Sequence, residues 1–182
     1  LCDFISTDAR WQVSIDWDGS MRLRERDSGR VQRSILRDPG HVYNARFSPD
    51  GNCFALACEP GPARFFEAAT LNETGGTKGL FVHAVGFAPD GQRFATGSTG
   101  REAVKIRDFS SKLDLLTLPG SGSLFIPVVF SPDGNLLATS TSGGAVDLPR
   151  GGSLHVWRAP SWEEIDAQTA SLGKRSSARK QH

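Results

Sequence analysis

Short apolar runs alternate with clusters of Pro, Asp and Gly along most of this chain. The clearest run, Cys53 to Cys58, is almost continuously apolar and follows directly after Ser48-Pro49-Asp50-Gly51. In that cluster proline fixes φ for the first central turn position, aspartate fills the second, and glycine accepts the positive φ that comes next. The pattern predicts a tight β-hairpin turn that leads into a strand buried on both faces, with a second strand over Ala63 to Ala68.

This unit recurs along the chain. Phe47-Ser48-Pro49-Asp50-Gly51 returns as Phe87 to Gly91 and as Phe130 to Gly134, while Ile5 to Ala9 keeps the aspartate but lacks the proline and glycine. The aspartates at positions 8, 50, 90 and 133 are 42, 40 and 43 residues apart. A period in the forties without internal helical periodicity is typical of four-stranded propeller blades. The residues expected to form the structural turns are Pro49, Asp50, Gly51, Pro89, Asp90, Gly91, Pro132, Asp133 and Gly134.

The predicted fold class is therefore all-β, a β-propeller of about four four-stranded blades with the first one truncated. The third unit repeats the pattern of the second, with strands expected over Gln92 to Ser98 and Ala103 to Asp108. Each blade also needs an outer strand, for which the candidates are Arg30 to Arg37, Leu71 to Leu80 and Lys112 to Leu118. The units are expected at about 1–29, 30–70, 71–111 and 112–160.

The third and fourth units also resemble the WD-repeat family, in the form with Ser-Pro-Asp-Gly repeats found in bacteria. The segment Phe94 to Asp108 (FATGSTGREAVKIRD) is similar to the family consensus, and Leu154-His155-Val156-Trp157 carries its tryptophan. At the equivalent position the other units have Arg24, Phe66 and Arg107. Family members often contain a hydrogen-bonded tetrad of His, Ser or Thr, Asp and Trp in each blade, which is nowhere complete here. These blades are expected to depend on packing instead of a repeated polar network.

The resemblance has consequences for the rest of the protein. WD-type propellers most often have about seven blades, so four units imply a partial ring and a remainder of the propeller upstream of Leu1. A small four-bladed ring is the competing interpretation. After the last unit, Ser161 and Glu164 form a capping box that predicts a short helix over 161–172, with a last outer strand over Glu163 to Ala167 as the rival. Residues 173–182 are expected to be a disordered basic tail.

Composition narrows the class of partner. The chain of 182 residues has a formal net charge of +1, and four of its basic residues lie in the last nine positions, which leaves a near-neutral, slightly acidic body. No nucleic acid partner is expected from such a body, and no run of 18 apolar residues exists to cross a membrane. The cysteines Cys2, Cys53 and Cys58 are odd in number and lack zinc-knuckle spacing, which favours free thiols in a reducing, cytoplasmic location.

Residues that could carry chemistry were sought and none formed a convincing set. There is no G-x-S-x-G motif, the four histidines are scattered, and the glycines of the Ser140 to Ser153 loop precede a strand instead of a helix. No catalytic, cofactor-binding or metal-binding residue is therefore predicted, and the repeated aspartates are explained by their turns. Arg24, Arg107 and Trp157 are the candidate interaction residues, because an arginine at the tryptophan position either snorkels along the blade or faces a partner carboxylate.

The predicted function is a non-catalytic protein-interaction scaffold that uses loops of one propeller face, as the C-terminal module of a larger regulatory protein. The expected partner is a protein or peptide, and no cofactor is expected. Two alternatives remain open: an accessory or sensor domain of an enzyme, of protein kinase or peptidase/TolB type, and a ligand sensor built on the Ser140 to Ser153 loop. Fold alone does not choose among them.

Overall fold

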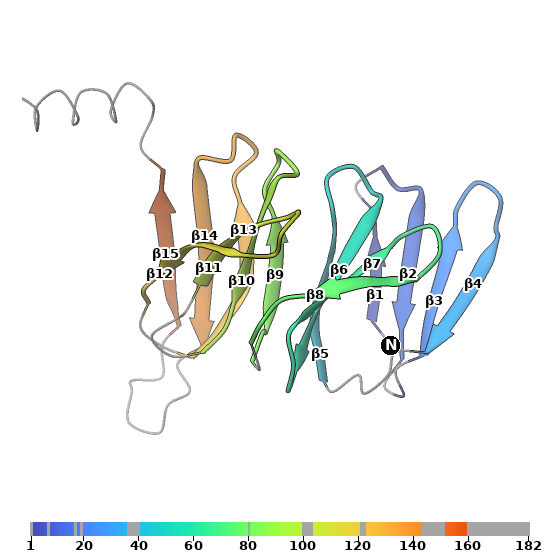
Figure 1. Ribbon diagram of the computed structural model, residues 1–182, viewed down its shortest axis with the longest axis horizontal. Coiled ribbons are helices and arrows are strands. Elements are labelled where there is room, and N and C mark those ends of the chain that lie inside the picture. The colour runs from blue at the N-terminus through green and yellow to red at the C-terminus, as the bar shows by residue number, and fades with distance from the viewer. Residues whose placement is uncertain are drawn as a thin grey trace, which may run out of the picture.

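The computed structural model is a row of antiparallel β-sheets, which in Figure 1 follow one another in chain order from right to left. It describes residues 2–6, 8–16, 18, 20–35, 41–79, 81–99, 104–120, 123–142 and 152–159. Within these residues there are three four-stranded sheets and one three-stranded sheet, and each sheet keeps its strands in sequence order. The structure confirms an all-β fold built from propeller blades.

The strands are, in chain order, β1 (Cys2–Ile5), β2 (Trp11–Ile15), β3 (Ser20–Glu25), β4 (Val31–Ile35), β5 (His41–Phe47), β6 (Cys53–Glu59), β7 (Ala63–Glu67), β8 (Glu73–Gly76), β9 (Ala84–Phe87), β10 (Arg93–Gly97), β11 (Val104–Asp108), β12 (Asp114–Leu118), β13 (Ser123–Phe130), β14 (Leu136–Ser142) and β15 (Ser153–Arg158). The first sheet is β1 to β4, the second β5 to β8, the third β9 to β12 and the fourth β13 to β15. The first strands of successive sheets, β1, β5, β9 and β13, are neighbours.

The three Pro-Asp-Gly segments lie at the same corner of successive sheets, between the first and second strands. In the second sheet the N–H of Gly51 donates to the Ser48 carbonyl at 2.9 Å, and the Ser48 N–H donates to the Cys53 carbonyl at 2.8 Å. The third and fourth sheets repeat both bonds, from Gly91 and Gly134 to the residues three positions earlier. Gly51, Gly91 and Gly134 have φ of 71°, 68° and 74°, the left-handed conformation that glycine adopts without a steric cost.

The core consists of three apolar clusters, one between each pair of adjacent sheets. The strand with the continuous apolar run, β6, contributes to two of them, because Cys58 packs toward the first sheet and Cys53 toward the third. These two free thiols therefore lie on opposite faces, as residues five positions apart on one strand must. Burial raises the pKa of each thiol to about 11, which keeps both protonated at neutral pH.

The first sheet differs from its prediction. It was expected to be truncated, yet β1 to β4 make it a full four-stranded sheet. The lost proline and glycine did not remove the turn, since Ala9 takes a φ of 59° and its N–H donates to the Ser6 carbonyl at 2.8 Å. The segment Ile5 to Ala9, which lacks the proline and glycine, therefore belongs to a complete four-stranded blade.

The sheets also divide the chain later than the expected boundaries at 30, 71 and 112. Each outer strand (β4, β8 and β12) was placed at the start of the next unit, but it hydrogen-bonds to the strand before it. In Figure 1, β8 and β12 cross the front of the molecule at the outer edge of their sheets. The predicted helix over 161–172, its rival strand and the tail lie outside the described residues.

The described part of the four sheets forms an open row and not a closed ring (Figure 1). The outward face of the fourth sheet is apolar, and its Leu154 is 73% exposed. The equivalent residue of the third sheet, Val104, is completely buried against the fourth. Leu154 is thus exposed where the equivalent residue of the third sheet is covered by a further sheet. This difference agrees with the predicted partial ring.

Candidate protein-interaction site on the rim of the third sheet

The site is built on the hairpin of β11 and β12, the two outer strands of the third sheet. Its turn is held by Asp108, whose carboxylate accepts hydrogen bonds from the Ser111 N–H and from the hydroxyls of Ser110 and Ser111, each at 2.7 Å. These bonds, led by the Ser111 N–H, lower the pKa of Asp108 to about 2. The Lys112 N–H donates to the Asp108 carbonyl at 2.9 Å, and Lys112 has a φ of 60°. The turn is therefore a fixed platform for the residues that follow it.

Arg107 lies at the tryptophan position of the third unit and is only 4% exposed. Its Nη1 is 2.6 Å from Oδ1 of Asp114, its Nε donates to the Thr96 hydroxyl at 3.4 Å, and its Nη2 donates to the Lys78 carbonyl at 3.4 Å. The carboxylate that Arg107 faces thus belongs to the next strand of its own sheet. Packing without a polar network was expected at the tryptophan position. In the third sheet Arg107 instead belongs to a polar network, and Asp114 balances the charge of its buried guanidinium group.

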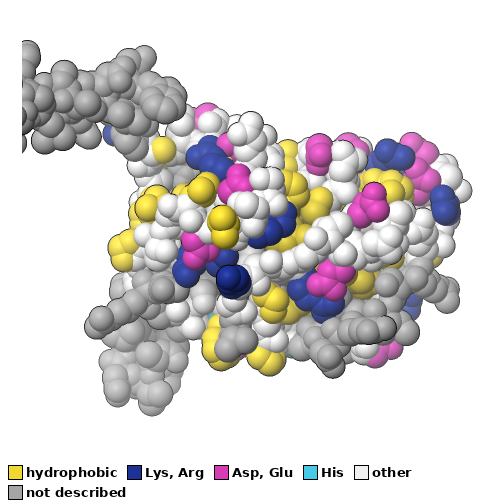
Figure 2. Space-filling view, in the orientation of Figure 1, with side chains coloured by type: hydrophobic (Ala, Val, Ile, Leu, Met, Phe, Trp, Pro, Cys, Tyr) yellow, Lys and Arg dark blue, Asp and Glu magenta, His cyan; other side chains and the backbone are white. Residues whose placement is uncertain are grey.

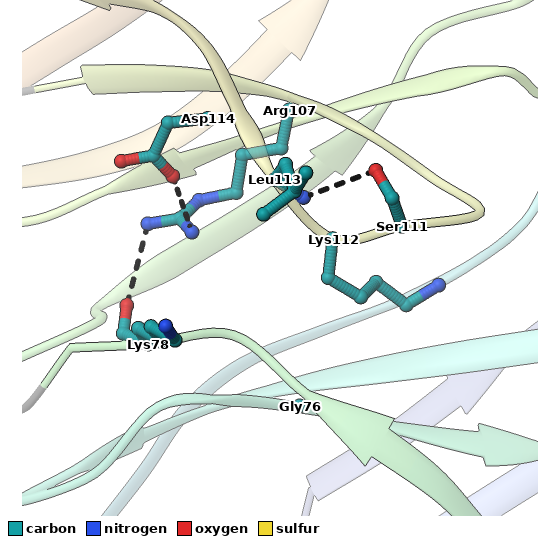
Figure 3. Close-up of a pocket in the computed structure, with 7 residues that line it drawn as sticks. All are labelled: Gly76, Lys78, Arg107, Ser111, Lys112, Leu113 and Asp114. Atoms are coloured by element: carbon teal, nitrogen blue, oxygen red, sulfur yellow. Dashed lines mark hydrogen bonds and ion pairs between the residues drawn. The ribbon is translucent and has the colours of Figure 1, made fainter.

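A pocket of about 430 Å³ opens beside Arg107, between the end of β8 and the β11–β12 turn (Figure 3). Its wall carries three cationic side chains, Lys78, Arg107 and Lys112, and one carboxylate, that of Asp114. Asp114 is already paired, with Arg107 and with Lys105 Nζ at 3.0 Å. The remaining lining residues are Gly76, Ser111 and Leu113. The pocket is consequently a positively charged recess.

The ammonium group of Lys112 is held by aromatic rings. Its Nζ lies 3.7 Å from the ring centroid of Phe109 and 4.5 Å from that of Phe65, and it donates to the Phe109 carbonyl. Burial lowers the pKa of Lys112 below the usual value for a lysine. A cation that has lost part of its water in this way interacts strongly with an anion that reaches it.

Leu113 lines this recess, and further exposed leucines follow it along the chain. Leu113, Leu115 and Leu116 are 63%, 57% and 51% exposed, although they lie within four consecutive positions of one chain segment. Figure 2 shows hydrophobic side chains beside lysine and arginine side chains over the part of this face that β12 crosses in Figure 1. The equivalent outer strand of the second sheet, β8, has the sequence ETGG and no apolar side chain. The leucines are therefore particular to the third sheet.

The other candidate residues lie elsewhere. Arg24 is exposed on β3 of the first sheet, and Trp157 is half-buried on β15 of the fourth, where its ring stacks on His155 with centroids 5.7 Å apart. Arg107 is between them on β11, so the structure does not bring the three together. The role of Arg24 and Trp157 in binding stays a prediction.

Sequence reasoning missed Lys78, Lys112, Asp114 and the exposed leucines. One signal was present: the segment Leu113 to Leu118 (LDLLTL) has four leucines in six positions, which is unusually apolar for the exposed outer strand of a blade. The pocket itself joins residues from two sheets and has no sequence signature.

A second polar cluster lies at the far end of the inner strands, where His83 is completely buried. Its Nε2 is 3.0 Å from a carboxylate oxygen of Glu59, and its ring meets that of Tyr43 edge-on at 5.0 Å. The Tyr43 hydroxyl also bonds to Glu59, and this bond is the main cause of the lowered pKa of that carboxyl group. The cluster ties β5, β6 and the approach to β9 together, which is a structural role.

Two features are absent from the part of the chain that the structure describes. There, no three His, Cys, Asp or Glu side chains are grouped so that they could hold a metal ion. Within the same residues, no helix has the length and apolar character needed to cross a bilayer.

Comparison with known proteins supports the WD-repeat resemblance. The chain is 28% identical over 131 residues to the WD repeat-containing protein SL1-17 of Schistosoma mansoni. The match covers 71% of this chain and 43% of that protein, so the chain corresponds to less than half of its relative. No family model matches the chain. The propeller blades and this relative together support the resemblance to the WD-repeat family.

Proposed function

We propose that this chain is a non-catalytic protein-interaction scaffold of the WD-repeat type. Its binding surface is the rim of the third sheet, by which we mean Lys78, Lys112, Leu113, Leu115 and Leu116. The observation that carries the proposal is the set of three exposed leucines beside a positively charged recess. Exposed apolar side chains grouped next to charged ones are typical of protein-binding surfaces. The similarity to a WD repeat-containing protein supports the same class.

The proposed surface differs from the one that the sequence suggested. Loops of one propeller face were expected to bind, whereas the rim site consists of an outer strand and its hairpin turn. Because the site is fixed by the sheet and by the Asp108 turn, little ordering is needed when a partner binds.

An affinity experiment tests the proposal. The chain would be immobilised as wild type, as the rim variant Leu115→Lys/Leu116→Lys, and as the matched control Thr74→Lys on β8. We expect a set of proteins to bind to wild type and to the control but not to the rim variant. Circular dichroism should show that all three immobilised chains are folded. The proposal is wrong if the rim variant retains the same proteins as wild type.

Three finer statements remain proposals. We propose that the chain is the C-terminal module of a larger, cytoplasmic regulatory protein, with further blades upstream of Leu1. Its relation to bacterial WD proteins rests on the Ser-Pro-Asp-Gly repeats. The enzyme-associated alternative would be favoured by a catalytic domain in the same polypeptide, and the sequence of the parent protein decides it.

A further inference from the structure

The partner of the rim can be specified further by the strand that forms it. Within the described residues β12 is the last strand of its sheet, so one edge of its backbone has no neighbouring strand among them. Edge strands accept extended segments of other chains, since main-chain N–H and C=O groups remain available for pairing. Natural edges are usually protected by charged side chains or proline. β12 instead carries leucines.

The charges beside β12 indicate the sign of the partner. Asp114 is paired with Arg107 and Lys105, so the remaining charges beside β12 are those of Lys78, Lys112 and the ionised Asp108, which interacts with Lys112. Among the residues that the structure describes, no carboxylate lies within ion-pair distance of either ammonium group. Figure 3 shows Lys78 below Arg107, and Lys112 on the turn with its side chain directed away from Lys78. An acidic side chain in the pocket would meet a lining that carries more positive than negative charge.

We propose that the rim binds an extended segment of a partner protein in which an Asp or Glu is flanked by apolar residues. The segment lies along the outer edge of β12, its apolar side chains contact Leu115 and Leu116, and its carboxylate enters the pocket that Lys78 and Lys112 line. This inference rests on the proposed function, because it assigns the chemistry of the partner to the same surface.

The outer strand of the second sheet supplies an internal comparison. β8 is also an edge strand, but it ends in Gly75 and Gly76 and carries no leucine. An extended acidic segment should therefore prefer β12 over β8, although both edges are open. The preference would come from side chains, since the backbone groups are alike.

The test uses a phage-displayed library of random ten-residue peptides selected against the full chain. We expect the selected peptides to contain an Asp or Glu between apolar residues. Binding of the synthesised peptides, measured by fluorescence anisotropy, should weaken by about tenfold or more for Lys112→Gln and for Leu115→Lys/Leu116→Lys, and should be unchanged for Thr74→Lys. Replacing the peptide's acidic residue by its amide should weaken binding similarly, and so should raising the salt concentration.

The outcomes separate this inference from the proposed function. Selected peptides that lack acidic residues, or that bind the rim variants as tightly as wild type, overturn the inference. So does the absence of any selected peptide. Proteins retained by wild type and lost with the rim variant in the affinity experiment would still support a scaffold function in each of these cases. Selected acidic peptides with the expected loss of binding support both.

Discussion

Four residues at one position of the repeat, Ala9, Gly51, Gly91 and Gly134, adopt a positive φ of 59° to 74°. In each case the N–H donates to the carbonyl three residues earlier. For an L-residue with a Cβ atom this left-handed conformation costs about 1–2 kcal/mol. Ala9 bears that cost, while the three glycines avoid it. The turn geometry therefore survives the sequence change, at the expense of local strain.

Exchanging these residues should change stability in opposite directions. Ala9→Gly should raise the free energy of unfolding by about 0.5 kcal/mol or more, because relief of the left-handed strain exceeds the added flexibility of the unfolded chain. Gly134→Ala should lower it by a similar amount. The nearest side-chain atom to a new Cβ there is 3.7 Å away, so only φ is strained. Urea unfolding measures both, and effects of the same sign for the two substitutions would contradict the argument.

Elements meet through small residues where the third and fourth sheets pack. A Cβ added to Gly97 on β10 would lie 2.1 Å from the Phe125 carbonyl oxygen, and one on Gly86 of β9 would lie 2.2 Å from that of Val128. β13 therefore approaches β9 and β10 with backbone against backbone. In the fourth sheet the position of Gly97 is occupied by Ser140, which faces the exposed side. Glycine is required only where the next sheet packs.

Gly97→Ala should accordingly destabilise the protein by about 1–3 kcal/mol, since the new methyl group must displace a strand backbone. Thr117→Ala, on the exposed outer strand β12, serves as the control and should stay within about 0.5 kcal/mol of wild type. Chemical unfolding of both variants checks this. A Gly97→Ala protein as stable as the control would show that β13 does not pack against β10 in this way.

At the scale of the whole molecule, the same ionised turn recurs in sheet after sheet. The carboxyl groups of Asp8, Asp50 and Asp133 have lowered pKa values, chiefly because each accepts a hydrogen bond from the serine two positions earlier. Asp108 at the rim turn has a pKa of about 2. A carboxyl group with a lowered folded-state pKa stabilises the fold above its unfolded-state pKa and loses that contribution as pH falls through the folded value.

Thermal stability should therefore be roughly constant from neutral pH down to about pH 4 and should fall between about pH 4 and pH 2. The double variant Ser48→Ala/Ser131→Ala removes two of the hydroxyl donors and should show a smaller fall across that range. Melting followed by circular dichroism at a series of pH values makes the measurement. If the variant and wild type lose stability in parallel, the turn aspartates are not the groups responsible.

The rim of the third sheet shows where prediction from sequence stopped. The segment Lys112 to Leu118 was expected to hold an outer strand, and β12 lies within it. The pairing of Arg107 with Asp114 depends on a register shift between Ile106 and Arg107. This shift cannot be predicted from the sequence. The recess beside them needs Lys78 from the second sheet. Residues from different sheets come together only through the packing of those sheets.

The repeated hairpins and the all-β class follow from the sequence alone, because a Pro-Asp-Gly turn is decided by the φ preferences of three adjacent residues. The burial of β6 follows as well, since an almost continuous apolar run is favoured between two sheets. Only the tertiary structure decided that the first sheet is complete, that Arg107 is buried against Asp114, and that leucines and cations share one rim. Those features depend on residues distant in the chain, whose contacts are fixed by strand register and sheet packing.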